Sequence, residues 1–242
     1  MAVIDDRRRR RGDFSPAALD GLLLAMTADP RYVFQDSAGT TAAVSHGDPV
    51  GLTTHRFGGS LDPSQSTDAA RPTLDIVNGV RGLRFNGTSQ FLDATGLTAA
   101  SGPKTVIAGC ITEDGETRGL QFLLDAQFGR IIYAAVRNVA GSVGLNDGSW
   151  STGGAYDSES LATLTFKHYA SGGGIRINGA TSEAENFTES VYGGSVAVGS
   201  RFDGALSFLN GVIHVLLIFD RALSDKEIQL CEAWVAARQG RT

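Results

Sequence analysis

The feature that most constrains this fold is a series of short runs in which apolar and polar residues alternate. In the run over 161–169, Ala162, Leu164 and Phe166 alternate with polar neighbours. A period of two puts successive side chains on opposite faces of a strand, so we expect one face in a core and one in solvent. Comparable runs predict strands over 83–86, 90–93, 104–111, 119–125, 130–137, 161–169, 174–178, 195–199 and 211–219.

Glycine-rich stretches between these runs predict turns. The chain has 31 glycines, and those at 153–154, 172–174 and 193–194 are expected between strands. A parallel sheet would need helices between its strands, and no helical pattern separates these runs. The sequence therefore predicts an all-β fold of two antiparallel sheets packed as a sandwich.

A helix is predicted at the end of the chain. Ser224 can cap its first turn, and Glu227 stands three residues later, as a capping box requires. Gly240 is placed to end the helix. One face of this helix is apolar and should pack on the sandwich through Ile228, Cys231, Trp234 and Val235.

The first 31 residues are predicted to form a separate attachment segment, followed by one domain over 32–242. The arginines at 7–11, Arg7, Arg8, Arg9, Arg10 and Arg11, form a basic arm. Ser15-Pro16 reads as a helix start, and a short amphipathic helix is expected over 16–27. Its apolar stripe, Leu19, Leu22, Leu23 and Met26, is expected to pack on the sandwich or on a neighbouring chain.

Charge and hydropathy exclude some partners. The net charge of −5 combines +3 in the first 11 residues with −8 in the remainder, and an acidic body argues against nucleic acid. The longest apolar run, 212–219, is interrupted by His214 and is much shorter than a membrane helix of ~20 residues. The basic start lacks a following apolar segment, so we expect no signal peptide and a soluble protein made in the cytoplasm. Cys110 and Cys231 are expected to be buried and unpaired.

Three segments carry a family resemblance. They are 82–87 followed by Phe91-Leu92, 175–179, and 211–228, whose last eight residues read Arg-Ala-Leu-Ser-Asp-Lys-Glu-Ile. This set resembles the laminin-G-like jelly-roll domains of the concanavalin-like superfamily, over about residues 80 to 240. The resemblance implies an antiparallel jelly-roll β-sandwich.

A second resemblance concerns residues 33–41, 47–51 and 69–73, which look like the lead-in of jelly-roll proteins from tailed phages and prophages. The chain departs from that pattern at 54–59, where Thr-His-Arg-Phe-Gly-Gly replaces the usual Asp-Lys-Ser-Gly turn. The resemblance implies a phage virion component, made in the host cytoplasm: a capsid decoration, fibre or tail-associated protein, homo-oligomeric on the particle and bound to other virion proteins. The alternative is a carbohydrate-binding adhesin that recognises host surface glycans.

The sequence predicts no enzymatic activity. A glycosidase needs two carboxylates at a defined separation, and no strand carries such a pair. The acidic clusters at 113–116 and 157–159 lie beside glycine or serine in expected turns. The histidines lack the spacing of a zinc site, and His214 is interpreted as structural.

Two sets of residues are candidate binding groups. Sugar binding would use aromatic rings in loops, and Trp150, Tyr156 and Tyr192 fit loosely, although ordinary packing of large rings at strand ends is the favoured explanation. No cofactor is predicted except calcium, which family members often hold through aspartate and backbone oxygens. The candidates are Asn146, Asp147 and Asp203, which are also typical turn residues.

Overall fold

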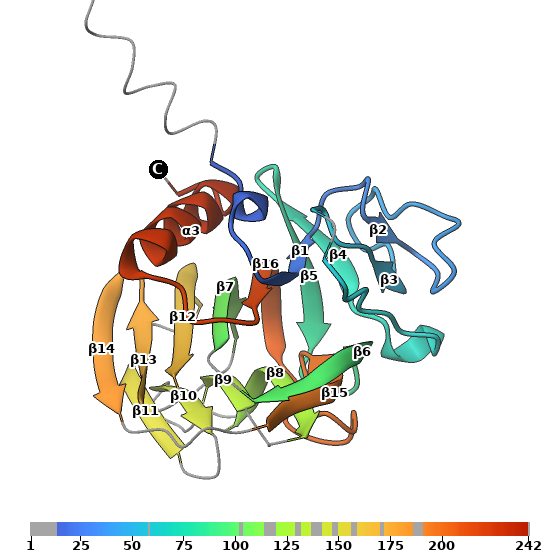
Figure 1. Ribbon diagram of the computed structural model, residues 1–242. Helices are drawn as coiled ribbons and strands as arrows, with labels where there is room; N and C mark the ends of the chain where they lie inside the picture. Colours follow the sequence, from blue (N-terminus) through green and yellow to red (C-terminus); the bar gives the residue numbers. More distant parts are fainter. Residues whose placement is uncertain are drawn as a thin grey trace, which may run out of the picture.

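The computed structural model describes residues 14–57, 59–101, 104–113, 120–128, 132–136, 142–146, 150–155, 159–169, 172–185 and 191–241. Within these residues, two antiparallel sheets pack face to face, and one helix lies on the outer face of the larger sheet (Figure 1). The predicted β-sandwich is confirmed. Among the described helices, none is long and apolar enough to cross a membrane.

The larger sheet has eight strands among the described residues. Its order is β14 (Ala180–Glu185), β13 (Gly172–Ile177), β12 (Ala162–Tyr169), β7 (Lys104–Thr112), β16 (Asn210–Phe219), β5 (Val80–Asn86) and β4 (Thr73–Val77). The eighth strand, β1 (Leu22–Thr27), pairs with the second half of β16, while β5 pairs with the first half. This arrangement brings the chain's beginning beside its last strand.

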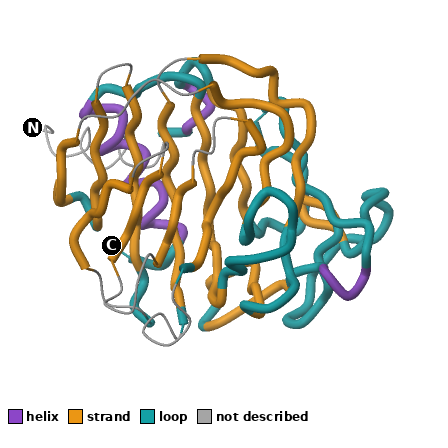
Figure 2. Tube along the Cα trace, turned by 90° about the horizontal axis from the view of Figure 1, so that it is seen from below, coloured by secondary structure: helices purple, strands orange, loops and turns teal. Residues whose placement is uncertain are grey.

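The smaller sheet has six described strands, in the order β11 (Trp150–Ala155), β10 (Ser142–Asn146), β9 (Ile132–Val136), β8 (Gln121–Phe128), β15 (Val191–Val198) and β6 (Leu92–Ser101). A short antiparallel pair, β2 (Val33–Phe34) and β3 (Leu52–Thr53), is connected to this sheet through Ser64. Ser64 forms one isolated β-bridge with Leu52 of β3 and another with Asp93 of β6. The segment between β1 and β4 holds this pair and one 3-10 turn, η2 (Asp68–Ala70), and forms loops at one side of the sandwich (Figure 2).

Alternation along the strands explains the core between the sheets. Leu164 and Phe166 of β12 point inward, as do Leu124 of β8 and Val196 and Val198 of β15. All are essentially inaccessible to solvent. Burying such side chains contributes about 1.5–3 kcal/mol each, and this supplies most of the drive for sheet packing.

The C-terminal helix, α3 (Asp225–Arg238), begins and ends as predicted. The Ser224 hydroxyl accepts a hydrogen bond from the Glu227 amide, and the Glu227 carboxylate accepts one from the Ser224 amide. The helix ends before Gly240, whose φ of 71° is accessible to glycine at little cost. Its apolar face is buried on the larger sheet, and Cys231 and Cys110 are both buried and free, as expected.

One expectation about β12 is wrong. Its polar face does not meet solvent, because α3 covers it. Thr165 is fully buried there and donates a 2.8 Å hydrogen bond to Glu232 of α3, which also pairs with Arg176 of β13. Thr163 donates to Gln239, so the buried polar groups on this face are satisfied within the protein.

The helix expected over 16–27 is also wrong beyond its first turn. A single 3-10 turn, η1 (Pro16–Ala18), is capped by Ser15, and the chain then enters β1. Both faces of β1 are covered: Leu24 and Met26 lie in the core between the sheets, and Ala25 lies under α3. The sandwich therefore begins before the boundary expected at residue 32.

Three glycine groups expected in turns lie inside strands instead. Residues 153–154 belong to β11, 172–174 to β13 and 193–194 to β15. Two of these strands carry register shifts, between Tyr192 and Gly194 and between Ser142 and Gly144 opposite β11. Glycine inside a strand commonly accompanies such irregularities, because it tolerates the altered backbone.

Candidate functional site

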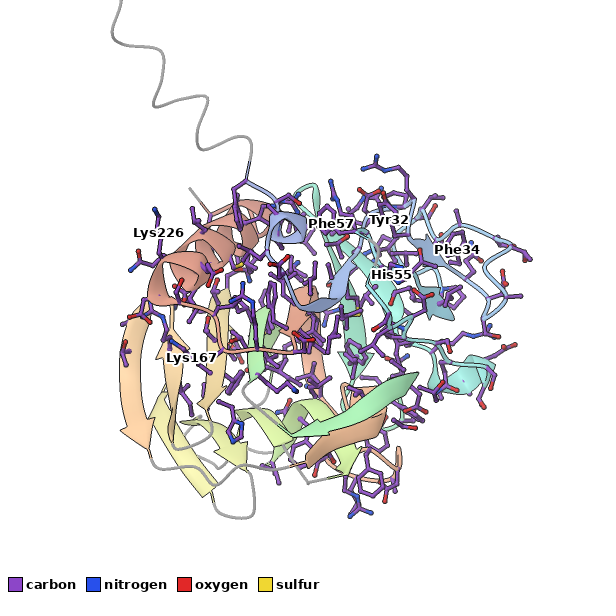
Figure 3. The ribbon with its side chains drawn as sticks, viewed as in Figure 1. Tyr32, Phe34, His55, Phe57, Lys167 and Lys226 are labelled. Carbon is purple, nitrogen blue, oxygen red and sulfur yellow. The ribbon has the colours of Figure 1, made fainter. Side chains whose placement is uncertain are left out.

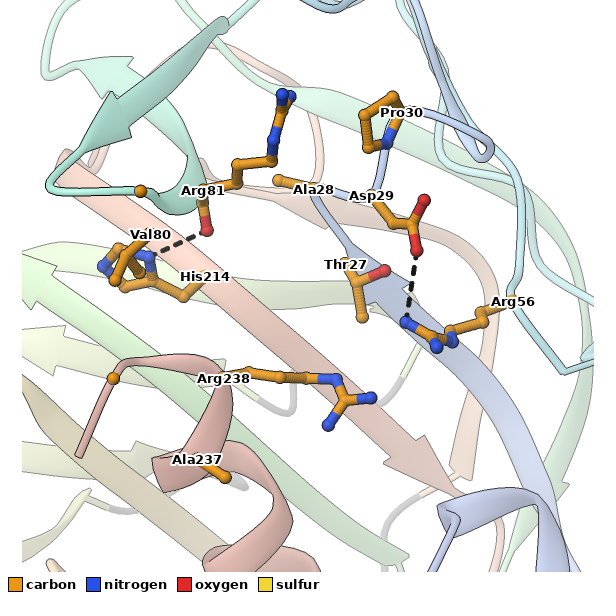
Figure 4. Close-up of a pocket in the computed structure, with 12 residues that line it drawn as sticks. Thr27, Ala28, Asp29, Pro30, Arg56, Val80, Arg81, His214, Ala237 and Arg238 are labelled. Carbon is orange, nitrogen blue, oxygen red and sulfur yellow. Dashed lines mark hydrogen bonds and ion pairs between the residues drawn. The ribbon is translucent and has the colours of Figure 1, made fainter. Parts of the chain in front are cut away.

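A cavity of about 400 Å³ opens where α3 ends, on the outer face of the larger sheet. We call it the arginine cavity, because Arg56, Arg81 and Arg238 line it (Figure 4). The lining residues come from the end of β1 and the turn after it, the loop after β3, the β4–β5 turn, β16 and the end of α3. Elements from both ends of the chain thus meet at one site.

Local backbone features position these residues. Asn78 and Gly79 both have positive φ, as in the tight hairpin turn that asparagine–glycine pairs favour, and this turn carries Val80 and Arg81 to the cavity. In β16 the register shifts between Ile213 and Val215. A β-bulge of this kind redirects a side chain, and His214 there lines the cavity instead of the core.

The cavity carries more positive than negative charge. Asp29 is the one carboxylate among its lining residues. Its two oxygens are already held by Arg31, through hydrogen bonds of 3.0 and 2.7 Å, and Arg56 adds a longer contact of 3.3 Å. The hydrogen bond from Arg31 lowers the pKa of Asp29 to about 2, so this carboxylate is ionised and engaged at neutral pH.

Two aromatic rings support two of the arginines. Phe57 and Trp234 are in tilted contact, with centroids 6.0 Å apart. The Arg56 guanidinium carbon lies 5.3 Å from the Phe57 centroid, and that of Arg238 lies 3.4 Å from the Trp234 centroid. Figure 3 shows Phe57 beside η1, whereas Lys226 lies at the other end of α3, where the helix begins. The two cations are therefore held on a rigid aromatic base.

Arg238 has a cation–π partner but no hydrogen bond or ion pair among the described residues. Burial, followed by the positive charge of Arg56, lowers the pKa of Arg238 to about 10. The guanidinium stays charged at neutral pH, yet part of its hydration is lost without a protein anion to replace it. Its hydrogen-bond donors are available to a ligand.

Two buried polar atoms at the cavity lack partners. The Thr27 hydroxyl oxygen and the His214 Nε2 atom are both inaccessible and form no hydrogen bond within the described residues. The His214 Nδ1 atom lies 3.0 Å from the Arg81 carbonyl oxygen and must donate to it, so Nε2 of the neutral ring is an acceptor. Burial lowers the pKa of His214, which keeps the ring neutral at pH 7.

The groups that the cavity presents are cationic. Its guanidinium donors suit an anionic group or other hydrogen-bond acceptors. General acid–base hydrolysis would need a carboxylic acid with a pKa near neutrality, and Asp29 has the opposite property.

The predicted sugar-binding aromatics lie elsewhere. Trp150 begins β11, where it pairs with Asn146 of β10, and Tyr192 lies in β15, where it pairs with Ala100 of β6. Tyr156 falls outside the described residues. Strands β11 and β15 are separated by β10, β9 and β8, so the sheet does not place Trp150 and Tyr192 on neighbouring strands.

The predicted calcium ligands are not assembled within the described part of the chain. Asp203 forms an ion pair with Arg201, which occupies both of its oxygens. Asn146 lies at the end of β10, and Asp147 falls outside the described residues. Among the described residues, no three histidine, cysteine or acidic side chains gather as a metal site requires.

The apolar residues predicted for attachment pack against the protein's own hydrophobic clusters. Leu19 and Leu22 lie against the cluster under α3, Leu23 lies against the core between the sheets, and Met26 is 1% exposed in that core. Their side chains therefore serve the sandwich itself. The arginines at 7–11 fall outside the described residues.

A second group of ionisable residues lies on the smaller sheet. Asp93 of β6 and Asp125 of β8 both pair with Ala197 of β15, so they flank it on one face of the sheet. Burial raises the pKa of each to about 6. Asp125 is 2% exposed and accepts a hydrogen bond from the Phe202 amide, and neither carboxylate lines the arginine cavity.

Sequence reasoning did not find the arginine cavity, although two signals pointed to it. Arg56 lies in the segment 54–59, where the chain departs from its phage-type resemblance. His214 interrupts the most apolar run of the sequence and was interpreted as structural. Nothing in the sequence links Thr27, Arg81 and Arg238, because their proximity arises only from the fold.

No protein-family model matches this chain, and no curated protein matches it in sequence. Solved structures similar in fold include Trypanosoma rangeli sialidase in complex with sialic acid, with a TM-score of 0.58 and 13% identity over 93% of this chain. This chain spans 34% of the length of that sialidase.

Two further structures are similar. Domain 4 of AbnA, a GH43 extracellular arabinanase from Geobacillus stearothermophilus, in complex with arabinotriose, has a TM-score of 0.50 and 17% identity, with 86% of this chain and 97% of that domain covered. The binding domain of botulinum neurotoxin serotype D has a TM-score of 0.55 and 10% identity, with 90% of this chain and 52% of that chain covered. At such identities the similarity shows the fold alone: this chain is an antiparallel β-sandwich of the kind found in these proteins.

Proposed function

We propose that this chain is a non-enzymatic carbohydrate-binding module. The observation that carries the proposal is the arginine cavity, an open site of about 400 Å³ where Arg238 has no hydrogen bond or ion pair among the described residues. Guanidinium groups donate several hydrogen bonds in a fixed geometry, and the hydroxyl and carboxylate oxygens of sugars accept them.

The similar structures support this choice of ligand. The arabinanase domain was solved with arabinotriose and the sialidase with sialic acid. The absence of activity is part of the proposal, because the carboxylate at the cavity, Asp29, is engaged by two arginines and has a pKa of about 2.

Binding of the full-length chain to an array of neutral and acidic glycans tests the proposal. We expect saturable binding to at least one glycan, with no release of reducing ends on prolonged incubation. Failure to bind any glycan would remove the carbohydrate-binding function, and release of reducing ends would overturn its non-enzymatic character.

We further propose that the module is displayed on a phage virion, as a capsid decoration, fibre or tail-associated protein in several copies. Support comes from the resemblance at 33–41, 47–51 and 69–73. In this setting the basic arm at 7–11 would contact other virion proteins, and the sandwich would face host surface glycans. Mass spectrometry of purified phage particles should detect the chain at a fixed ratio to the major capsid protein. Its absence from intact particles would exclude this role.

A further inference from the structure

The charge at the arginine cavity does not follow the charge of the protein. The chain as a whole carries −5, whereas three arginines line this cavity beside a single aspartate. Arg31, which does not line the cavity, takes the stronger hydrogen bonds of that aspartate. The cavity therefore retains a positive charge that no described side chain neutralises.

This positive charge is concentrated at one place. Arg238 is stacked on Trp234, and Arg56 is stacked on Phe57, whose ring contacts Trp234. Two like charges on adjoining rings repel each other, and the positive charge of Arg56 is one cause of the lowered pKa of Arg238. A bound anion would relieve this repulsion and pair with guanidinium donors already fixed in orientation.

The guanidinium groups select the kind of ligand that fits this cavity. Arg238 forms no hydrogen bond or ion pair among the described residues, and its planar fork of donors matches a carboxylate or a sulfate group. The Thr27 hydroxyl and His214 Nε2 are closed off from solvent, so the arginines are the groups that can meet a ligand.

We infer that the arginine cavity binds an anionic sugar unit, with its carboxylate or sulfate group on Arg238 and Arg56. This inference rests on the proposed carbohydrate-binding function and names its ligand class. A cavity of about 400 Å³ has room for one or two sugar rings. The two anionic groups share the same chemistry, because the guanidinium fork matches both.

The test uses the full-length chain and three variants on the glycan array. Arg238→Gln removes the unpaired cation and keeps a long polar side chain. Lys226→Gln is the matched control, because it removes one positive charge from an exposed position at the other end of α3. Arg56→Gln repeats the test at a second cation, and circular dichroism confirms that each variant is folded.

We expect acidic glycans to bind the wild type and Lys226→Gln equally. Arg238→Gln and Arg56→Gln should each bind these glycans at least about tenfold more weakly. Carboxylated and sulfated glycans on the array distinguish the two sources of charge. Binding confined to neutral glycans, unchanged in Arg238→Gln, would overturn the inference and leave the carbohydrate-binding function standing. Binding to no glycan at all would overturn both.

Calorimetry with the best acidic glycan, its analogue with the carboxyl reduced to an alcohol or the sulfate removed, and inorganic sulfate completes the test. The acidic glycan should bind more tightly than either of the others. If inorganic sulfate binds as tightly as the glycan, the site is an anion site and the sugar assignment is wrong.

Discussion

The Arg238 guanidinium lies 3.4 Å from the centroid of the Trp234 ring, one turn earlier in α3. The indole ring has two roles. The ring packs in the apolar cluster that joins α3 to the larger sheet. The same ring also supports the Arg238 cation at the edge of the arginine cavity. Stability and the proposed ligand binding therefore depend on the same ring, and variants must separate the two.

The first prediction concerns this ring. Trp234 is 8% exposed, so Trp234→Ala should lower the free energy of unfolding by about 3–5 kcal/mol, through lost burial and the cavity left behind. Urea denaturation measures the change. Leu230→Ala, at a position 38% exposed on the same helix, should cost less than about 0.5 kcal/mol. Equal losses in both variants would mean that helix propensity, rather than burial of the ring, determines the effect.

The second prediction concerns the buried ion pair that joins α3 to β13. Arg176 donates to both Glu232 oxygens, at 2.9 and 3.1 Å, and both side chains are largely buried. Glu232→Gln leaves Arg176 without a countercharge and should cost about 3 kcal/mol. The double change Glu232→Leu with Arg176→Met should cost less than Glu232→Leu alone. A double-mutant cycle on unfolding free energies measures this, and simple additivity would show that the pair is not coupled.

The third prediction is a pH dependence. Burial raises the pKa of Asp125 to about 6, above the ~3.9 expected in the unfolded chain. The contribution of this group to stability is therefore fully present below about pH 4 and is lost as the pH rises through about 6. Asp125→Asn retains an acceptor for the Phe202 amide and should stabilise the protein by about 1–2 kcal/mol at pH 7.5 but not at pH 4. Thermal melts across this range measure the difference.

Asp36 provides a control of opposite sign. Hydrogen bonds from the Thr40 amide, and then from the Thr40 hydroxyl and other amides, hold its pKa below the usual range. Its contribution is present above about pH 4 and lost in acid. Asp36→Asn should therefore destabilise the protein at pH 7.5 and have a shrinking effect as the pH falls. The same pH profile for both variants would contradict the assignment of Asp125.

Local signals explain what the sequence could predict of the fold. The capping box at Ser224 and Glu227 lies within one turn, and the alternation in β12 lies within one strand, so both were visible in the sequence. The run at 22–27 was misleading. It is buried on both faces, so its apolar residues fit the spacing of a helix as well as that of a strand, and pairing with β16 decides the outcome.

The sequence does not predict most of the candidate site, for a related reason. Its chemistry comes from residues as far apart as Thr27 and Arg238, which only the pairing of β1 with β16 and the docking of α3 bring together. Aromatic residues among glycines predict loops at Trp150 and Tyr192, yet both positions lie in strands. Composition near a turn identifies a residue type but not its neighbours in space.

The last prediction separates folding from attachment at the N-terminus. Deleting residues 1–27 removes β1, whose Leu24 and Met26 are 1% exposed and whose backbone pairs with β16 over Leu22–Thr27. Two such side chains alone contribute about 3–6 kcal/mol, a large share of the stability of a typical domain. This deletion should therefore give insoluble or unfolded protein, and its failure to join particles would say nothing about attachment.

Replacing the five arginines at 7–11 with serine leaves every described residue unchanged, and this variant should unfold at the wild-type temperature. If the basic arm attaches the protein to particles, the serine variant should bind phage particles that lack this chain more weakly than the wild type does at low salt. The difference should be smaller at high salt, because screening removes the arginine contribution. A folded protein after deletion of 1–27 would contradict the structural role of β1, and equal binding of the serine variant at low salt would contradict the role of the arm.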